Sequence, residues 1–193
     1  MLQRRYAFVT SFYGLNNSGI YSEIKISEES IFYYRYIASP VGRLLLGGQA
    51  GILEMIGFPE GNGVIYPADD WIQNDSVFKQ VEDQLNEYFA GERQQFDLKI
   101  KPSGTLFQLS VLETLQEIPY GHTTTYSSVA ERIGRPKAFR AVGVANGRNP
   151  LPIVIPCHRV IGADGSLTGF GGGLPTKSFL LNLESAGLSH ACL

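Results

Sequence analysis

The alternation of apolar and polar residues divides the chain into a strand-rich first half and a helix-rich second half. Residues 31–38, 43–48 and 52–58 are rich in aromatic and aliphatic side chains, and short turns containing glycine separate them. Such stretches between turn residues are typical of β-strands. They predict an antiparallel meander of three strands.

A helix is expected after the meander, because apolar residues recur at intervals of three and four over residues 75–90. Gly91 ends this pattern. Phe96, Leu98 and Ile100 then alternate with polar residues and predict one more strand. The region after the meander thus adds a helix and a strand.

Two boundaries divide the chain into three parts. Residues 1–30 are a polar extension, and the sequence does not reveal its role. Residues 31–101 are expected to form a small mixed α/β domain with an antiparallel sheet. A Pro-Ser-Gly sequence opens residues 102–193, which are expected to form a mostly helical second domain. The predicted fold class is therefore α/β of the α+β kind.

Three helices are predicted in the first half of the second domain. Residues 105–118 carry apolar side chains on one face, and 126–133 and 137–147 form shorter segments. A Gly-Arg-Pro turn joins the two short segments, and Thr125 or Ser128 can cap the first of them. Two short helices joined in this way predict a helix-turn-helix.

The second short helix has two different faces. Its predicted buried face consists of Ala138, Ala141, Val142 and Ala145. At 100° per residue, Arg140 points roughly 150° away from the centre of that face, and Gly143 lies on the same outer side. An exposed arginine on a thin helix suits a DNA groove. The alternative is an ordinary helix of small residues packed tightly on a neighbour.

The stretch 153–161 places a cysteine and a histidine between two apolar runs, which predict a buried strand. Neighbouring side chains on a strand point to opposite faces, so Cys157 and His158 are not expected to touch directly. A thiol with a base nearby is a candidate nucleophile. The alternative is that Cys157 only packs in the core, as many free cysteines do.

The chain closes with a helix predicted from Pro175 to Gly187, after the glycine-rich loop 169–173. Leu180 belongs to its apolar side. Glu184 follows four residues later, at the flank of that side. A carboxylate in such a place either reaches solvent or is paired.

Composition favours a globular protein of the reducing cytoplasm. Hydrophobic residues make up 44% of the chain, and its two cysteines are too few for a disulfide framework. No segment is suited to be a signal peptide or to span a membrane. The first hundred residues hold 8 Lys and Arg against 13 Asp and Glu, and the remainder holds 8 against 5. Six basic and no acidic residues lie between Arg132 and Arg159, which predicts a surface for a polyanion.

Short motifs along the second domain resemble those of a known family. They are Tyr120-Gly121, Thr125-Tyr126, Arg140-Ala141-Val142-Gly143, Asn149-Pro150, Ile155-Pro156-Cys157-His158-Arg159-Val160, Thr168-Gly169-Phe170 and Leu180-Leu181-Asn182-Leu183-Glu184. With them, residues 105–184 closely resemble the O6-alkylguanine-DNA alkyltransferases, or methylated-DNA–protein-cysteine methyltransferases. Residues 31–101 resemble the family's N-terminal domain more weakly.

The resemblance implies a role for each matching residue. Cys157 is expected to accept the alkyl group, His158 to act on it as a base through a water, and Glu184 to orient His158. Asn149 is expected to brace the turn beside the site. Phe170 stands where the family often has tyrosine, so a hydroxyl contact to guanine is not expected there.

The resemblance also implies which residues face DNA. Tyr126 is expected to help rotate the nucleotide and to donate toward guanine, and Arg140 to fill the gap left by the flipped base. The further residues expected at the DNA are Arg135, Ala138, Ala141 and Gly143, and those expected in the base pocket are Tyr126, Val160, Phe170 and Gly171. Some relatives bind zinc, but residues 1–101 contain neither Cys nor His, so no metal or cofactor is expected.

These features predict direct DNA repair by a monomer. An alkyl group on O6 of guanine in double-stranded DNA would pass to Cys157 after the base is flipped out, and action on O4 of thymine stays open. The thioether product is not reversed by thiol exchange, so one turnover per molecule is expected. The alternatives are a non-enzymatic binder of alkylated DNA, a helix-turn-helix regulator and a cysteine hydrolase.

Overall fold

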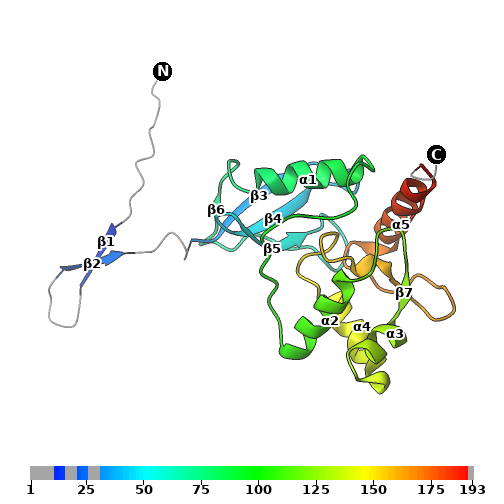
Figure 1. Cartoon of the computed structure of the whole chain (residues 1–193). Coiled ribbons are helices and arrows are strands. Elements are labelled where there is room, and N and C mark those ends of the chain that lie inside the picture. Colours follow the sequence, from blue (N-terminus) through cyan, green and yellow to red (C-terminus); the bar gives the residue numbers. More distant parts are fainter. Residues whose placement is uncertain (1–10, 16–20, 26–30, 191–193) are drawn as a thin grey trace.

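A computed structural model of the chain describes residues 11–15, 21–25 and 31–190 (Figure 1). Within the N-terminal extension, β1 (Ser11–Leu15) and β2 (Tyr21–Lys25) pair as antiparallel strands. The sequence had predicted no element there.

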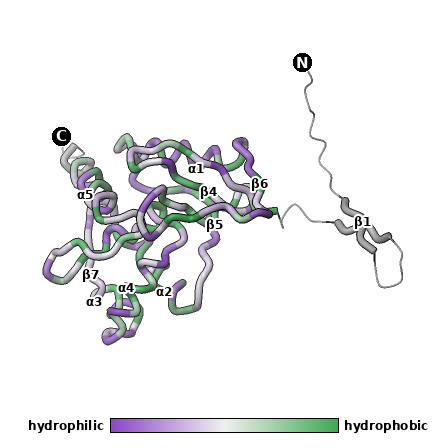
Figure 2. The backbone as a smooth tube through the Cα atoms, turned by 180° about the vertical axis from the view of Figure 1, so that it is seen from behind, coloured by the Kyte–Doolittle hydropathy of each residue, from purple (hydrophilic) through white to green (hydrophobic). Residues whose placement is uncertain are grey.

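A four-stranded sheet forms the base of the first domain. Its meander of β3 (Tyr33–Ile37), β4 (Leu44–Gln49) and β5 (Ile52–Gly57) is as predicted. β6 (Ile72–Gln73) adds a parallel edge beside β3, so the strand order is β5-β4-β3-β6. Five of the six residues in β4 are buried, which means that both faces of the sheet are covered. The hydrophobic tube through β4 and β5 marks this interior (Figure 2).

Helix α1 (Lys79–Phe89) lies beside this sheet (Figure 1). It begins later than predicted, because Phe78 has a positive φ of 58° and cannot continue a right-handed helix. The strand predicted at Phe96–Ile100 is wrong. Only Ile100 forms an isolated bridge, with Leu53, so the alternating residues lack a neighbouring strand along their length.

The second domain opens with the predicted helices. Helix α2 (Leu106–Gln116) starts at Thr105, whose side chain forms a capping box with Gln108. Helix α3 (Tyr126–Arg132) is capped by Thr125, which decides between the two predicted caps. A 3-10 turn, η2 (Pro136–Ala138), then leads into α4 (Phe139–Gly147), completing the two short helices joined by a turn.

The buried face of α4 differs from the prediction. Val142 and Ala145 are buried as expected, but Asn146 joins them, while Ala141 is exposed and Ala138 half-buried. Ala138 lies in the 3-10 turn. Because this turn has fewer residues per turn than an α-helix, Ala138 does not line up with the buried face of α4.

The strand predicted around the cysteine is wrong for most of its length. Residues Cys157–Arg159 form a 3-10 turn, η3, and only β8 (Val160–Ile161) pairs, in parallel with β7 (Thr124–Thr125). Two features bend the chain before this turn. Ile153 has a positive φ of 76°, and Pro156 cannot donate to a neighbouring strand.

Helix α5 (Gly173–His190) starts before Pro175 and continues past Gly187, so both predicted ends are wrong. Pro175 fits within the first turn, where its missing N–H is not needed. A side chain at Gly187 would place its Cβ 2.9 Å from the hydroxyl oxygen of Tyr120. Gly187 therefore permits close packing and does not end the helix.

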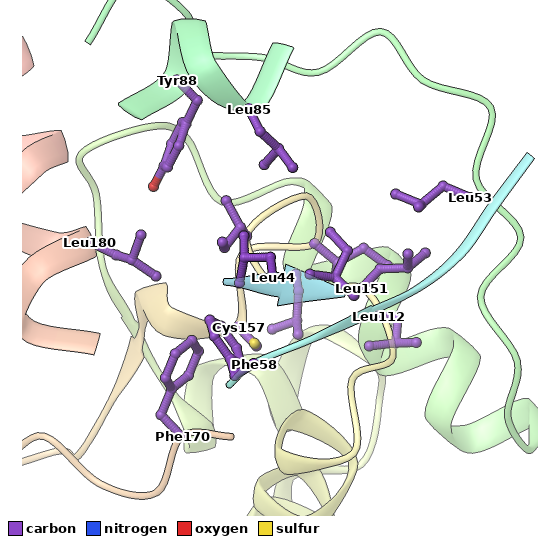
Figure 3. Packing of buried hydrophobic residues seen from close by; sticks show 14 of the residues in the cluster. Leu44, Leu53, Phe58, Leu85, Tyr88, Leu112, Leu151, Cys157, Phe170 and Leu180 are labelled. Carbon is purple, nitrogen blue, oxygen red and sulfur yellow. The ribbon is translucent and has the colours of Figure 1, made fainter. Parts of the chain in front are cut away.

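The two domains share one core. Backbone hydrogen bonds join Ile56 N to Pro150 O at 2.8 Å and Gly63 N to Gly171 O at 2.8 Å. Phe58 and Phe170 meet edge to face, with ring centroids 5.3 Å apart. Both rings lie close to Cys157 in the buried cluster (Figure 3).

Candidate active site

Cys157 lies almost completely buried, with 3% of its surface exposed. It lines a small cavity of about 40 Å³ together with Phe58 and Asn149. This cavity shares Gly147 and Gly171 with a larger pocket of about 400 Å³. The cavity beside the thiol and the larger pocket are therefore neighbours.

Two asparagines hold the backbone around the thiol. The Asn149 side chain donates from Nδ2 to Ile155 O at 2.8 Å and accepts from Leu151 N at 3.0 Å, so it ties together both ends of the turn before Cys157. Asn146, which the sequence did not single out, donates to Cys157 O at 3.3 Å.

The thiol is neutral at pH 7. Burial raises the pKa of Cys157 to about 11, although hydrogen bonding by Asn149 and the charge of Lys177 oppose this effect. Since the thiolate is the reactive form, attack at neutral pH requires a base.

His158 is a buried histidine that follows Cys157 in the sequence. Its Nε2 lies 2.8 Å from Glu184 Oε1, and both side chains are fully buried. Burial lowers the pKa of His158, against the opposing effect of Glu184, and favours the neutral ring. Nε2 then carries the proton that faces the carboxylate, which leaves the lone pair on Nδ1. In the part of the chain that the structure describes, buried Nδ1 has no hydrogen-bond partner.

Glu184 is paired and does not reach solvent, which decides between the two possibilities left by the sequence. Arg159 donates to both of its oxygens at 2.9 Å, Tyr88 Oη donates to Oε1 at 2.8 Å, and Gly121 N donates to Oε2 at 3.0 Å. Burial raises the pKa of Glu184, but the hydrogen bonds from His158 and Arg159 outweigh it and hold the pKa at about 2. The carboxylate is therefore charged and fixed in place.

Arg159 does not belong to the basic surface predicted from the sequence. It is only 6% exposed, because its guanidinium pairs with Glu184 and also donates from an Nη atom to Ile118 O at 2.6 Å. The sequence alone could not show whether Arg159 lies on the basic surface or in a buried ion pair.

Lys177 and Tyr88 were also missed. Lys177 is fully buried and donates from Nζ to Val160 O at 2.6 Å and to Thr168 O at 2.9 Å. Its helical spacing from Leu180 and Glu184 places it on the inner face of α5, and that spacing is the signal that could have found it. Tyr88 gave only the pattern of an ordinary core residue on α1.

The larger pocket contains most of the predicted substrate residues. Its lining consists of Asn62, Tyr126, Phe139, Arg140, Gly143, Gly147, Thr168, Gly169, Phe170 and Gly171. The Tyr126 hydroxyl accepts from Thr168 Oγ1 at 3.1 Å. Val160 is fully buried in β8 and is not among these lining residues, so its place in the base pocket stays a prediction. Asn62 and Phe139 were not predicted.

The exposed basic residues gather around the helix-turn-helix. Arg135, Lys137, Arg140 and Arg148 are exposed, and no ion pair involves them within the described residues. Arg132 instead pairs with Glu117. The basic surface is thus smaller than the sequence suggested, but it adjoins the pocket through Arg140.

Comparison with known proteins agrees with this arrangement. Residues 106–186 match the family model "6-O-methylguanine DNA methyltransferase, DNA binding domain", and residues 32–102 match its "ribonuclease-like domain". A methylated-DNA–protein-cysteine methyltransferase of Methanosarcina acetivorans is 51% identical over 80% of this chain and 99% of that protein. The one of Mycobacterium tuberculosis is 46% identical over 81% of this chain and 94% of that protein.

Solved structures agree as well. The crystal structure of Mycobacterium tuberculosis O6-methylguanine methyltransferase matches with a TM-score of 0.76 at 46% identity, covering 81% of this chain and 94% of that one. The same relative has been solved in complex with DNA, and that structure also gives a TM-score of 0.76.

The fold and these similarities together define a DNA-binding transferase. The chain belongs to the methylated-DNA–protein-cysteine methyltransferase family. Its activity is alkyl transfer in DNA repair. Across the described residues, no three His, Cys, Asp or Glu side chains gather as metal ligands, and no helix is both long and apolar enough to cross a bilayer.

Proposed function

We propose that the protein removes alkyl groups from O6 of guanine in double-stranded DNA and takes them onto Sγ of Cys157. The observation that carries this proposal is the buried Cys157 thiol beside a pocket of about 400 Å³ that opens next to the exposed α4. That volume is in the range of sites that enclose small organic ligands, which suits an extruded base. The names of the relatives support the same substrate.

The transfer step balances without a cofactor. Sγ attacks the alkyl carbon as the thiol proton leaves toward His158 Nδ1, through a bridging water. A carbon–sulfur bond forms, the bond from that carbon to O6 breaks, and its electron pair passes to the guanine. The guanine gains one proton, so the overall exchange leaves charge unchanged. Glu184 stabilises the imidazolium while it carries that proton.

Residues at the pocket rim would present the base. Arg140 is exposed beside the opening and can occupy the space of the flipped nucleotide. Burial raises the pKa of the Tyr126 hydroxyl, which therefore stays protonated and can donate to the guanine as negative charge develops. Arg135 is exposed and can contact a phosphate, while the small residues Ala138, Ala141 and Gly143 allow the backbone of this region to approach the DNA closely.

Intact-mass analysis with a duplex that contains O6-methylguanine tests the proposal. The protein should gain one methyl group per molecule and no more, and peptide mapping should place it on Cys157. Cys157→Ala should gain none while still binding the duplex, and an undamaged duplex is the control. Binding without any mass gain in the wild type would instead favour the non-enzymatic binder.

We propose also that the protein acts as a monomer in the cytoplasm. Every side chain assigned to the thiol, the base and the pocket comes from one chain. The free thiol of Cys157 needs a reducing compartment to stay available. Light scattering of the protein alone and on a short duplex tests the stoichiometry, and a mass of two chains per lesion would contradict it.

A further inference from the structure

Phe139 is an exposed aromatic side chain in a region with several small residues. It is the first residue of α4, and 44% of its surface is exposed. It does not belong to the buried cluster or to the residues packed against it. A single exposed ring is common on protein surfaces, so its meaning here depends on what surrounds it.

The partner is indicated by what surrounds the ring. Phe139 lines the larger pocket together with Tyr126 and Arg140, and its ring centroid lies 5.6 Å from the Arg140 guanidinium carbon. Adjacent residues on a helix point about 100° apart, so the two side chains cannot fill the same space. With Arg140 directed outward, Phe139 occupies the neighbouring side, at the rim of the pocket.

We propose that Phe139 is a second DNA wedge, whose ring stacks on the base next to the lesion while Arg140 occupies the gap left by the flipped nucleotide. This inference rests on the proposed function. Apolar side chains inserted beside an opened base step are a known means of holding duplex DNA unstacked. A ring can stack on any base, so the contact should not depend on the sequence around the lesion.

The remaining outward residues support this assignment. Ala141, Gly143 and Gly147 add little side-chain bulk to this part of α4, so the larger exposed side chains there are Phe139, Arg140 and Val144. The Phe139 ring is therefore placed to reach the bases together with Arg140 when this face of α4 approaches the duplex. Its position at the pocket rim then opposes return of the extruded nucleotide into the stack.

The test compares Phe139→Ala with the wild type on a duplex and on a single strand, each with O6-methylguanine. Transfer from the duplex should slow about tenfold, because loss of one stacked base costs roughly five- to 150-fold in such contacts. The loss should be much smaller on the single strand, where no stack is held open. Phe139→Tyr keeps the ring and should restore transfer.

A matched ring deletion serves as the control. Phe179 on α5 is 38% exposed, packs against Phe89 with centroids 6.5 Å apart, and does not line the pocket. Phe179→Ala should transfer from the duplex at the wild-type rate. Mass gain from free O6-benzylguanine shows that each variant is folded with a reactive thiol.

The outcomes separate the two proposals. A wild type that gains no mass from either DNA substrate overturns the proposed function itself. If the wild type reacts, the wedge is overturned by an unimpaired Phe139→Ala, by an equal loss on the single strand, or by failure of tyrosine to restore the rate. A loss confined to the duplex and restored by tyrosine supports it.

Discussion

At the scale of single residues, the proposed transfer depends on which atoms of His158 and Glu184 already take part in hydrogen bonds. Two of the hydrogen bonds that Glu184 accepts come from the buried cation Arg159. The carboxylate therefore stays charged, holds the proton on His158 Nε2, and leaves Nδ1 as the acceptor. In the resting protein both the Cys157 thiol and the His158 ring are therefore uncharged, and we propose that charge develops on them only during transfer.

Glu184→Gln should destabilise the protein and slow transfer strongly. It leaves the Arg159 guanidinium buried without a counter-charge, which typically costs about 3–5 kcal/mol. It also removes the carboxylate that stabilises a protonated His158, so transfer should slow by about a hundredfold or more. Urea unfolding and single-turnover rates measure the two effects.

Glu117→Gln is the matched control, because Glu117 pairs with Arg132 on the surface. It should change stability by less than about 1 kcal/mol. Similar losses in both variants would show that the Glu184 charge has no special role.

The same carboxylate makes stability depend on acid. The pKa of Glu184 is about 2 in the folded protein, below its ordinary value of 4.5. A lowered carboxylate pKa contributes stability above the unfolded value, and this contribution is lost as the pH falls from about 4.5 to 2. It amounts to about 3 kcal/mol at neutral pH. Unfolding measured over this range should show the loss in the wild type and a weaker one in Glu184→Gln.

At the scale of elements, α5 and α1 meet at the active site. Helix α5 carries Lys177, Leu180 and Glu184 on its inner face, and α1 of the other domain contributes Tyr88. Tyr88 is fully buried, and Figure 3 shows it extending from α1 into the shared core. A helix of the first domain thus helps to hold Glu184, the carboxylate that we propose orients His158.

Tyr88→Phe removes only the hydroxyl that bonds Glu184 Oε1. The free energy of unfolding should fall by about 1.5–3 kcal/mol, the range for hydrogen bonds to charged groups. Transfer should slow less than in Glu184→Gln, because His158 and Arg159 still hold the carboxylate. Tyr66→Phe, at a tyrosine that is 80% exposed, is the control for stability and rate. Equal stability of the two variants would contradict a coupling between the domains through Tyr88.

Periodicity predicted the elements well where each buries a continuous face. The meander, α2 and α3 follow from local patterns, and the motif around Cys157 led to the right family. Local patterns failed where distant contacts decide the conformation. Apolar residues around Cys157 predicted a strand, but a positive φ at Ile153 and two asparagine side chains bend that stretch into a turn. Likewise, only the folded structure reveals that Tyr88 reaches Glu184, 96 residues away in sequence.

At the scale of the whole molecule, a seam of glycines joins the domains beside the pocket. Gly61 and Gly63 face Gly171 so closely that a Cβ at Gly61 would lie 2.5 Å from Gly171 O. Asn62, between these two glycines, is thereby brought to the pocket wall. The first domain is thus part of the substrate site and more than a support for it.

Gly61→Ala should open this seam, while Gly51→Ala should not. Both glycines have a positive φ, of 86° and 78°, so each alanine carries a similar strain of about 1–2 kcal/mol. No atom lies within 4 Å of a Cβ at Gly51, whereas Gly61 must displace the Gly171 backbone. Gly61→Ala should therefore lose more stability and transfer more slowly. Indistinguishable variants in urea unfolding and transfer assays would contradict the importance of the seam.

The order of Cys157 and Glu184 along the chain has a consequence for synthesis. During translation, Cys157 is made before Glu184, the carboxylate proposed to orient His158. Tyr88 and Arg159, which bond Glu184 in the folded protein, are also made before it. Domains fold largely in the order in which they are made. Until Glu184 has been made, we therefore expect the nascent chain to carry Cys157 without the carboxylate proposed to orient His158, and premature use of the thiol would be slow.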